Sequence, residues 1–335
     1  MKFIPVQLES IAANLSDRKI NFYLFHDGKN IAYVNKLRKI KYNNIKFHDI
    51  IVDDTQIYDE IAKMGGGWCG AAYYSLCAHK YLPKDTDRVL YLDTADILII
   101  NKIDDYYFDD FEDKMLIVTT LRYKLRDSGI RSSDVEELFR DAELYQRKDL
   151  SEGEYFAKIA HGLFNSGSYV INLDKMRKSS YDIKDYLIQA KTFYESRDII
   201  PKKYFEGKKD LGQWGDQVYW GDQGFISLLF VGDIKYFNYP KIRNTIYMPY
   251  NFGIWYFDRT EEELYYPISI IHYTGYGCIK PWQGKYQTFL KRFQEKSNLQ
   301  ELDKFNANQV KCYNIWYQYA LMASRRLDNC KIKGL

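Results

Sequence analysis

The chain has 335 residues, of which 46% are hydrophobic and 28% are charged, and its formal net charge is +3. This composition can build a sizeable core and differs from that of disordered or fibrous chains. A net charge this small gives no argument for a nucleic-acid partner.

Cysteine usage and hydropathy indicate the cellular compartment of the protein. The five cysteines are odd in number and show no C-x-x-C spacing, which favours a reduced compartment over a disulfide framework. No stretch approaches the roughly 20 apolar residues of a membrane span, and the N-terminus lacks the pattern of a signal peptide. We therefore expect a cytoplasmic protein that is at most peripheral to a membrane.

Strand and helix patterns alternate along the N-terminal part of the chain. The expected elements are a helix over 5–14, a strand over 20–25, a helix over 31–40, a strand over 45–51 and a helix over 71–81. This alternation predicts an α/β protein with a largely parallel sheet covered by helices on both faces. In such sheets, ligands bind beyond the carboxyl ends of the strands.

The next strand carries two carboxylates. It is an apolar run from Val89 to Ile100, interrupted by Asp93 and Asp96. An ionised carboxylate in a buried strand is costly unless it is paired or bound to a metal. Two acids where a strand gives way to a turn therefore suggest a divalent cation held by oxygen ligands. A surface turn whose aspartates cap backbone amides is the alternative interpretation.

A second group of chemically active residues lies near position 272. Further strands are expected over 115–120, 168–173 and 268–273, with helices over 134–163 and 174–196. The last strand ends in His272, and Gly275 and Lys280 follow. Imidazole suits a transition metal already held by carboxylates, and lysine supplies charge for phosphate. A buried structural histidine is the alternative interpretation.

The tetrapeptide Trp-Gly-Asp-Gln occurs at 214–217 and again at 220–223. Only the second copy, with Asp222 and Gln223, leads directly into an apolar run, over 225–230. Asp222 therefore suits both a binding site and the N-cap of a helix.

From Lys285 onward the chain is expected to be helical, with ten basic residues against four acidic ones. This composition fits an amphipathic helix on an anionic membrane surface. It fits better a helix that packs its aromatic residues on the main domain.

Taken in order, these segments resemble family 8 glycosyltransferases, which include bacterial lipopolysaccharide galactosyl- and glucosyltransferases and, more distantly, glycogenin. The resemblance covers most of residues 1–283 and rests on 89–96, 164–173, the Asp222-Gln223 pair and 272–282. It implies a GT-A fold, with a mostly parallel central sheet flanked by helices. The catalytic domain would span 1–283, and a C-terminal helical extension would span 284–335.

The resemblance also implies a reaction and its components. It implies transfer with retention from a nucleotide sugar, usually a UDP-sugar, to a glycan or glycoconjugate acceptor of the cell envelope, with bound Mn²⁺, or Mg²⁺ in its place. The site residues that it implies are, for the metal, Asp93, Asp96 and His272; for the nucleotide sugar, Asn165, Gly167, Gly275 and Lys280; and for catalysis, Asp222 and Gln223.

The sequence departs from the family pattern at four places. Two residues separate Asp93 from Asp96 where most relatives have one, so the two carboxylates can converge only if the backbone bulges or turns. Ser75 stands where relatives carry an arginine that orders the nucleotide site, and the loop between Gly275 and Lys280 is two residues longer. The chain begins inside the loop that follows the family's first strand, so we expect either a start upstream of Met1 or a rearranged sheet with an incomplete nucleotide site. An upstream start is favoured, because deletion of a central strand would leave the backbone groups of its neighbours unpaired.

These departures leave two hypotheses. One is a metal-dependent transferase that moves a hexose from a UDP-sugar. The other is a degenerate relative that binds a sugar or a nucleotide without turnover. Asp104 and Asp105 are interpreted as solvated turn residues in both.

Overall fold

The structure is a computed structural model of the chain. It describes residues 3–64, 69–94, 96–119, 164–179, 182–196, 221–230, 233–237, 252–253, 268–273, 280–283 and 299–332. The helix expected over 134–163 lies outside these residues, as does Gly275.

The N-terminal part begins with a helix and a parallel pair of strands. Helix α1 (Ile4–Asn14) has Pro5 in its first turn, where the missing N–H costs no hydrogen bond. Strands β1 (Ile20–His26) and β2 (Ile45–Ile51) pair in parallel and are connected through α2 (Ile31–Leu37). The expected helix–strand–helix–strand order is confirmed here.

The other described strands form two more sheets. The central sheet has the order β3 (Arg88–Leu92), β6 (Ser168–Asn172), β5 (Leu116–Val118) and β7 (Ile234–Tyr236). The third sheet has the order β4 (Ile97–Ile99), β9 (Ile270–His272) and β8 (Phe252–Gly253). No strand in the described part of the chain pairs with both β1 and β3.

The expectation of a mostly parallel sheet is only partly met. Of the six pairings between described strands, β1–β2, β5–β7 and β8–β9 are parallel, whereas β3–β6, β5–β6 and β4–β9 are antiparallel. The prediction rested on helices that alternate with strands, because parallel neighbours need a long crossover connection. That alternation is interrupted between β3 and β4, which no helix separates.

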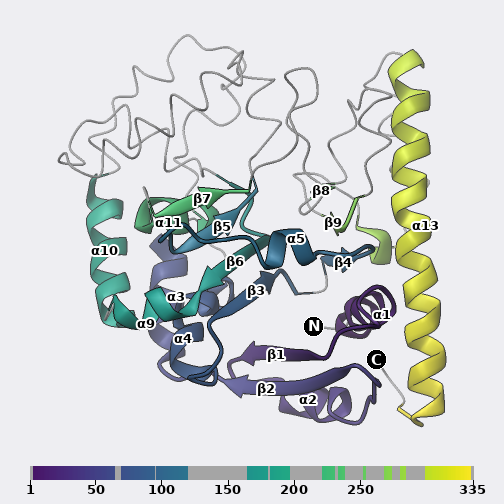
Figure 1. The fold of residues 1–335 in the computed structure, drawn as a ribbon, viewed down its shortest axis with the longest axis horizontal. Coiled ribbons are helices and arrows are strands. Elements are labelled where there is room, and N and C mark those ends of the chain that lie inside the picture. Colours follow the sequence, from purple (N-terminus) through teal and green to yellow (C-terminus); the bar gives the residue numbers. More distant parts are fainter. Residues whose placement is uncertain are drawn as a thin grey trace.

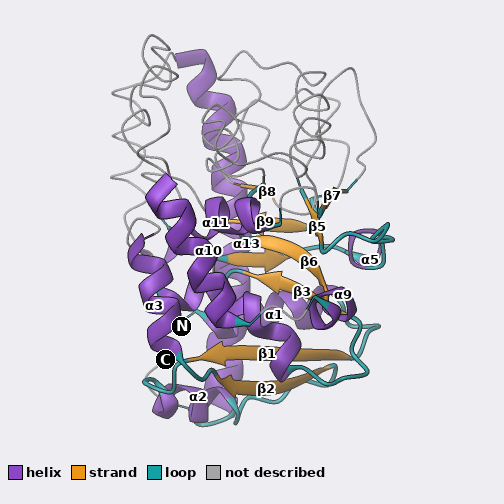
Figure 2. Cartoon of the chain, turned by 90° about the vertical axis from the view of Figure 1, so that its left-hand side faces the viewer, coloured by secondary structure: helices purple, strands orange, loops and turns teal. Residues whose placement is uncertain are grey.

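Helices gather at two places around the sheets (Figures 1 and 2). Beside the central sheet lie α3 (Thr55–Met64), the 3₁₀ helix η1 (Gly70–Cys77), α4 (Ala78–Tyr81), α9 (Leu173–Lys178), α10 (Ile183–Ser196) and α11 (Gly221–Leu229). At the other side, α13 (Leu299–Asn329) runs along α1, next to the short η5 (Pro281–Gln283). The remaining short helix is α5 (Asp104–Tyr107).

Three helical predictions need correction. No helix was expected between β2 and residue 71, but α3 follows the bend at Asp53 and Asp54, and its Tyr58, Ile61 and Ala62 are buried at helical spacing. The helix expected over 71–81 is a 3₁₀ helix for most of its length. The helix expected over 174–196 is divided between α9 and α10.

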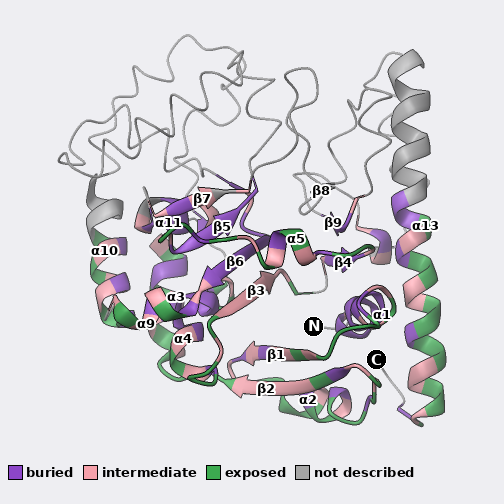
Figure 3. Cartoon of the chain, in the orientation of Figure 1, coloured by how far each residue is buried: buried purple, intermediate pink, exposed green. Residues whose placement is uncertain are grey.

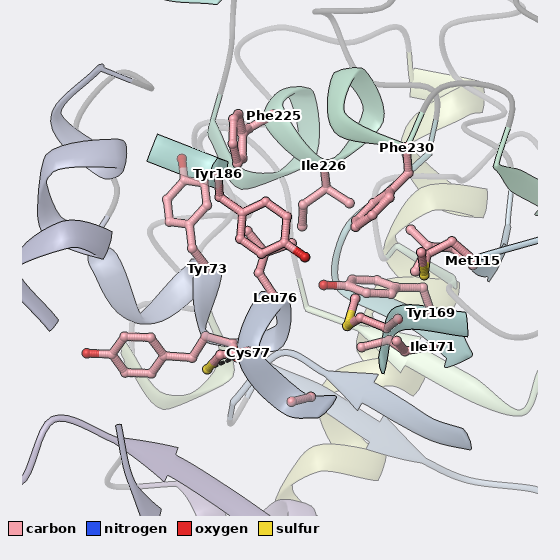
Figure 4. Packing of buried hydrophobic residues seen from close by; sticks show 14 of the residues in the cluster. Tyr73, Leu76, Cys77, Met115, Tyr169, Ile171, Tyr186, Phe225, Ile226 and Phe230 are labelled. Atoms are coloured by element: carbon pink, nitrogen blue, oxygen red, sulfur yellow. Dashed lines mark hydrogen bonds between the residues drawn. The ribbon is translucent and has the colours of Figure 1, made fainter. Parts of the chain in front are cut away.

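The core is centred on the middle strands. Figure 3 shows β5 and β6 as buried, while β1 and β2 are partly exposed. On one face of the central sheet, aromatic and aliphatic side chains of η1, α10, α11 and β6 pack together (Figure 4). Phe225 of α11 meets Tyr73 of η1 edge to face, with ring centroids 5.8 Å apart. This packing fixes the position of α11 relative to the carboxyl end of β3.

The C-terminal helix packs its aromatic side chains inward. Tyr313 and Trp316 are buried, and the Trp316 ring lies 5.5 Å from that of Phe3. No helix among the described residues is both long enough and apolar enough to span a bilayer.

Candidate active site

The chain leaves the central sheet after β3 and enters the third sheet at β4. The Asp93 amide donates to the carbonyl of Gly167 at 2.9 Å, which extends the β3–β6 pairing. The Tyr273 amide donates to the carbonyl of Asp96 at 2.7 Å, which extends the β4–β9 pairing. The expected turn in the backbone is therefore present, and it places the two aspartates in different sheets.

Asp93 faces the histidine that ends β9. Its Oδ2 lies 3.5 Å from Nε2 of His272, a separation beyond the normal length of a hydrogen bond. His272 is almost fully buried, whereas about a third of the Asp93 side chain is open to solvent. The Asp93 Oδ1 accepts a hydrogen bond of 2.8 Å from the Tyr91 hydroxyl. This places a partly exposed carboxylate beside a buried imidazole at the edge of a buried sheet.

Gly167 lies directly against the His272 ring. A Cβ at position 167 would lie 2.1 Å from Cε1 and 2.4 Å from Nδ1 of the imidazole, so only glycine fits there. The Asn165 side chain accepts a hydrogen bond of 3.0 Å from the Gly167 amide and thereby shapes the turn that precedes β6. Asn165 and Gly167 thus come together with Asp93 and His272.

Helix α11 brings a second carboxylate to the same place. Asp222 lies in its first turn, one residue after Gly221, whose φ is +43°. Burial and the neighbouring Asp93 carboxylate raise the pKa of Asp222 to about 6, while a hydrogen bond from Ser166 opposes the shift. Hydrogen bonds with the backbone at Asp222 and Gln223 also oppose it. Asp222 is the second residue of α11 and so does not stand at the N-cap position expected for it, whereas its closeness to the Asp93 carboxylate agrees with its interpretation as a site residue.

Asp96 has a different partner. Its Oδ2 lies 2.5 Å from the Lys280 ammonium, which also donates to the carbonyl of Tyr273 and lies 5.7 Å from the centre of the Trp282 ring. In the described part of the chain, no three His, Cys, Asp or Glu side chains meet in a metal-binding cluster. A joint site of Asp93, Asp96 and His272 thus stays a prediction, as does phosphate binding by Lys280.

Three residues beside this site were not predicted to take part. Tyr91 lies two positions before Asp93, and the two-residue period of a strand indicates that the two share a face. Gln7 donates from its side chain to the Asp93 carbonyl at 3.0 Å, and its signal is a polar residue on the buried face of a helix. Nothing in the sequence singled out Ser166.

Ser75, expected to weaken the donor site, accepts a hydrogen bond of 2.7 Å from Tyr169.

Comparisons with known proteins agree with this architecture. The family model described as glycosyl transferase family 8 matches residues 1–285. A structure of an active-site mutant of LgtC shares 19% identity, with a TM-score of 0.51 over 84% of this chain and 85% of that one. A structure of the galactosyltransferase LgtC with donor and acceptor sugar analogues shares 20% identity, with a TM-score of 0.50 over 92% of this chain and 91% of that one. No curated protein matches the chain. The expected α/β GT-A fold is confirmed.

Proposed function

The chain belongs to glycosyl transferase family 8, and we propose that it is a metal-dependent retaining transferase that moves a hexose from a UDP-sugar to a glycan or glycoconjugate acceptor. The observation that carries the proposal is the meeting of Asp93, His272, Gly167 and Asp222 from four separate segments of the chain. They meet beyond the carboxyl end of β3, where ligands bind in α/β sheets.

Asp93 and His272 are suited to hold a divalent cation together. A separation of 3.5 Å suits two ligands of one ion when each lies about 2.1 Å from it. Carboxylate oxygen and neutral imidazole are both ligands of Mn²⁺ and related ions. Asp96 would complete the set once its carboxylate no longer pairs with Lys280. When bound, the cation would supply positive charge to the leaving diphosphate.

The protein's own residues have three tasks in this proposal. Lys280 adds a second positive charge for the diphosphate. Burial raises the pKa of Asp222 to about 6, which is still below neutral pH. Asp222 therefore places negative charge beside the sugar as that sugar gains oxocarbenium character. Asn165 and Gly167 give the sugar a shaped backbone surface, with Gln223 beside it on the first turn of α11. The resemblance to family 8 implies a catalytic role for Gln223.

UDP release from a panel of UDP-hexoses, with Mn²⁺, with Mg²⁺ and with chelator, tests the proposal. We expect metal-dependent release from one donor. His272→Ala should reduce it by more than about 100-fold, because the loss of an outer partner of a ligand already costs 10- to 100-fold. Asp105→Asn is the matched control, since Asp105 is exposed on α5 and should retain full activity. Metal-independent release, or full activity of His272→Ala, would contradict the metal assignment.

The pairing of Asp96 with Lys280 favours a second candidate function. A relative that binds a sugar or nucleotide without turnover does not need Asp96 as a metal ligand. UDP binding that is equally tight with Mn²⁺ and with chelator, in the absence of any UDP release, would support this candidate over the transferase.

We also propose that α13 contacts a membrane peripherally, at the inner face of the envelope membrane. The support is a strip of exposed apolar residues on α13, namely Tyr317, Leu321 and Met322, followed by the exposed Arg325. Co-sedimentation with anionic vesicles should fall for Leu321→Glu, and equal sedimentation of both proteins would contradict this contact.

A further inference from the structure

The side chain of Tyr91 is fixed on the face of the central sheet. Tyr91 of β3 and Tyr169 of β6 are direct partners in the strand register. Their rings stack with centroids 4.7 Å apart and an interplanar angle of 27°. Because Tyr169 is 1% exposed and belongs to the buried strand β6, its ring holds the stacked Tyr91 ring in place.

The Tyr91 hydroxyl selects one of the two oxygens of Asp93. Strand geometry places residues 91 and 93 on the same face, and the hydroxyl donates to Oδ1 at 2.8 Å. Oδ2 is left as the oxygen that faces Nε2 of His272.

The backbone of Asp93 is held as well. Its amide donates to Gly167 at 2.9 Å, and its carbonyl accepts from the Gln7 side chain at 3.0 Å. The remaining freedom of the residue is rotation within its own side chain, and the terminal torsion of aspartate is broad. The hydrogen bond from Tyr91 restricts that rotation.

We propose that Tyr91 is a positioning residue that holds the Asp93 carboxylate with Oδ2 toward His272, so that the two side chains are preorganised to share one divalent cation. This inference rests on the proposed metal site and adds a residue to it. The partners of metal ligands typically contribute 10- to 100-fold in metal affinity by fixing ligand orientation.

The test is a titration of the protein with Mn²⁺ in the absence of donor. Electron paramagnetic resonance of the free Mn²⁺ ion measures how much of it is bound. Tyr91→Phe keeps the stacked ring and removes only the hydroxyl, and we expect Mn²⁺ affinity to fall about 10-fold or more. The matched control is Tyr169→Phe, which keeps the same stack and removes a hydroxyl that donates to Ser75. Its Mn²⁺ affinity should stay within about 2-fold of the original.

A second readout separates positioning from general damage. In the UDP-release assay, Tyr91→Phe should need more Mn²⁺ for half-maximal activity while kcat at saturating Mn²⁺ stays close to the original. Unchanged affinity in Tyr91→Phe, or an equal loss in Tyr169→Phe, would overturn the role of Tyr91 alone. If the unaltered protein binds no Mn²⁺, the proposed metal site and this inference are both overturned.

Discussion

At the scale of single residues, the close contact between Gly167 and His272 is the most restrictive feature of the site. Any side chain at position 167 would overlap the imidazole ring. Gly167→Ala should therefore displace His272 and weaken Mn²⁺ binding, and overpacking should cost about 1–3 kcal/mol of stability. Urea unfolding and Mn²⁺ titration measure the two effects.

His272→Ala serves as the background for the control. With the ring removed, the additional change Gly167→Ala meets no imidazole, so it should cost much less stability than in the original protein. An equal cost in both backgrounds would show that the destabilisation does not come from the contact with His272.

Asp222 gives the site a defined pH dependence. Its pKa is raised from 3.8 to about 6, so between these values the native state keeps a proton that the unfolded state has lost. Stability therefore falls as pH rises through this window, and the cost persists above it. In chelator, Asp222→Asn should be more stable than the original by about 3 kcal/mol at pH 8 and equal to it at about pH 3, below both pKa values. A difference that does not change with pH would contradict the raised pKa.

At the scale of elements, α13 is joined to α1 by an ion pair between the partly exposed Arg326 and the buried Glu9. Glu9 is 1% exposed, and Arg326 reaches it with two guanidinium nitrogens. Tyr42 also donates to Glu9 at 3.1 Å. Arg326→Met should leave the carboxylate buried without its cation and cost about 3 kcal/mol in thermal or urea unfolding.

Glu9→Gln in the Arg326→Met background removes the buried charge that has lost its partner. It should recover part of the stability that Arg326→Met loses. If Arg326→Met unfolds like the original protein, α13 does not depend on this pair for its attachment.

Element prediction succeeded where local periodicity and tertiary packing agree. β2 has the bounds expected from its apolar pattern, and α1 begins one residue early. Asp53 and Asp54 lie in a bend after β2, and α3, which was not predicted, begins at the next residue with an apolar spacing typical of a helix. The 3₁₀ geometry of η1 leaves no mark in periodicity, because a short run of apolar residues suits both kinds of helix.

At the scale of the whole molecule, the order of weak motifs was enough to predict the family and the fold. It also predicted that Asp93, His272 and Asp222 come together, although 178 residues lie between Asp93 and His272. The partner of Asp96 could not be predicted in this way. The turn after β3 leads into a different sheet, and that change of sheet brings Asp96 to Lys280.

The central claim is that Asp93 and His272 share a divalent cation that serves the donor diphosphate. Anomalous diffraction at the manganese edge, from crystals grown with Mn²⁺ and UDP, tests it most directly. The account predicts a manganese peak at bonding distance from Oδ2 of Asp93 and Nε2 of His272, with the UDP diphosphate on the same ion. A peak bound elsewhere, or UDP bound at this site with no manganese, would contradict it.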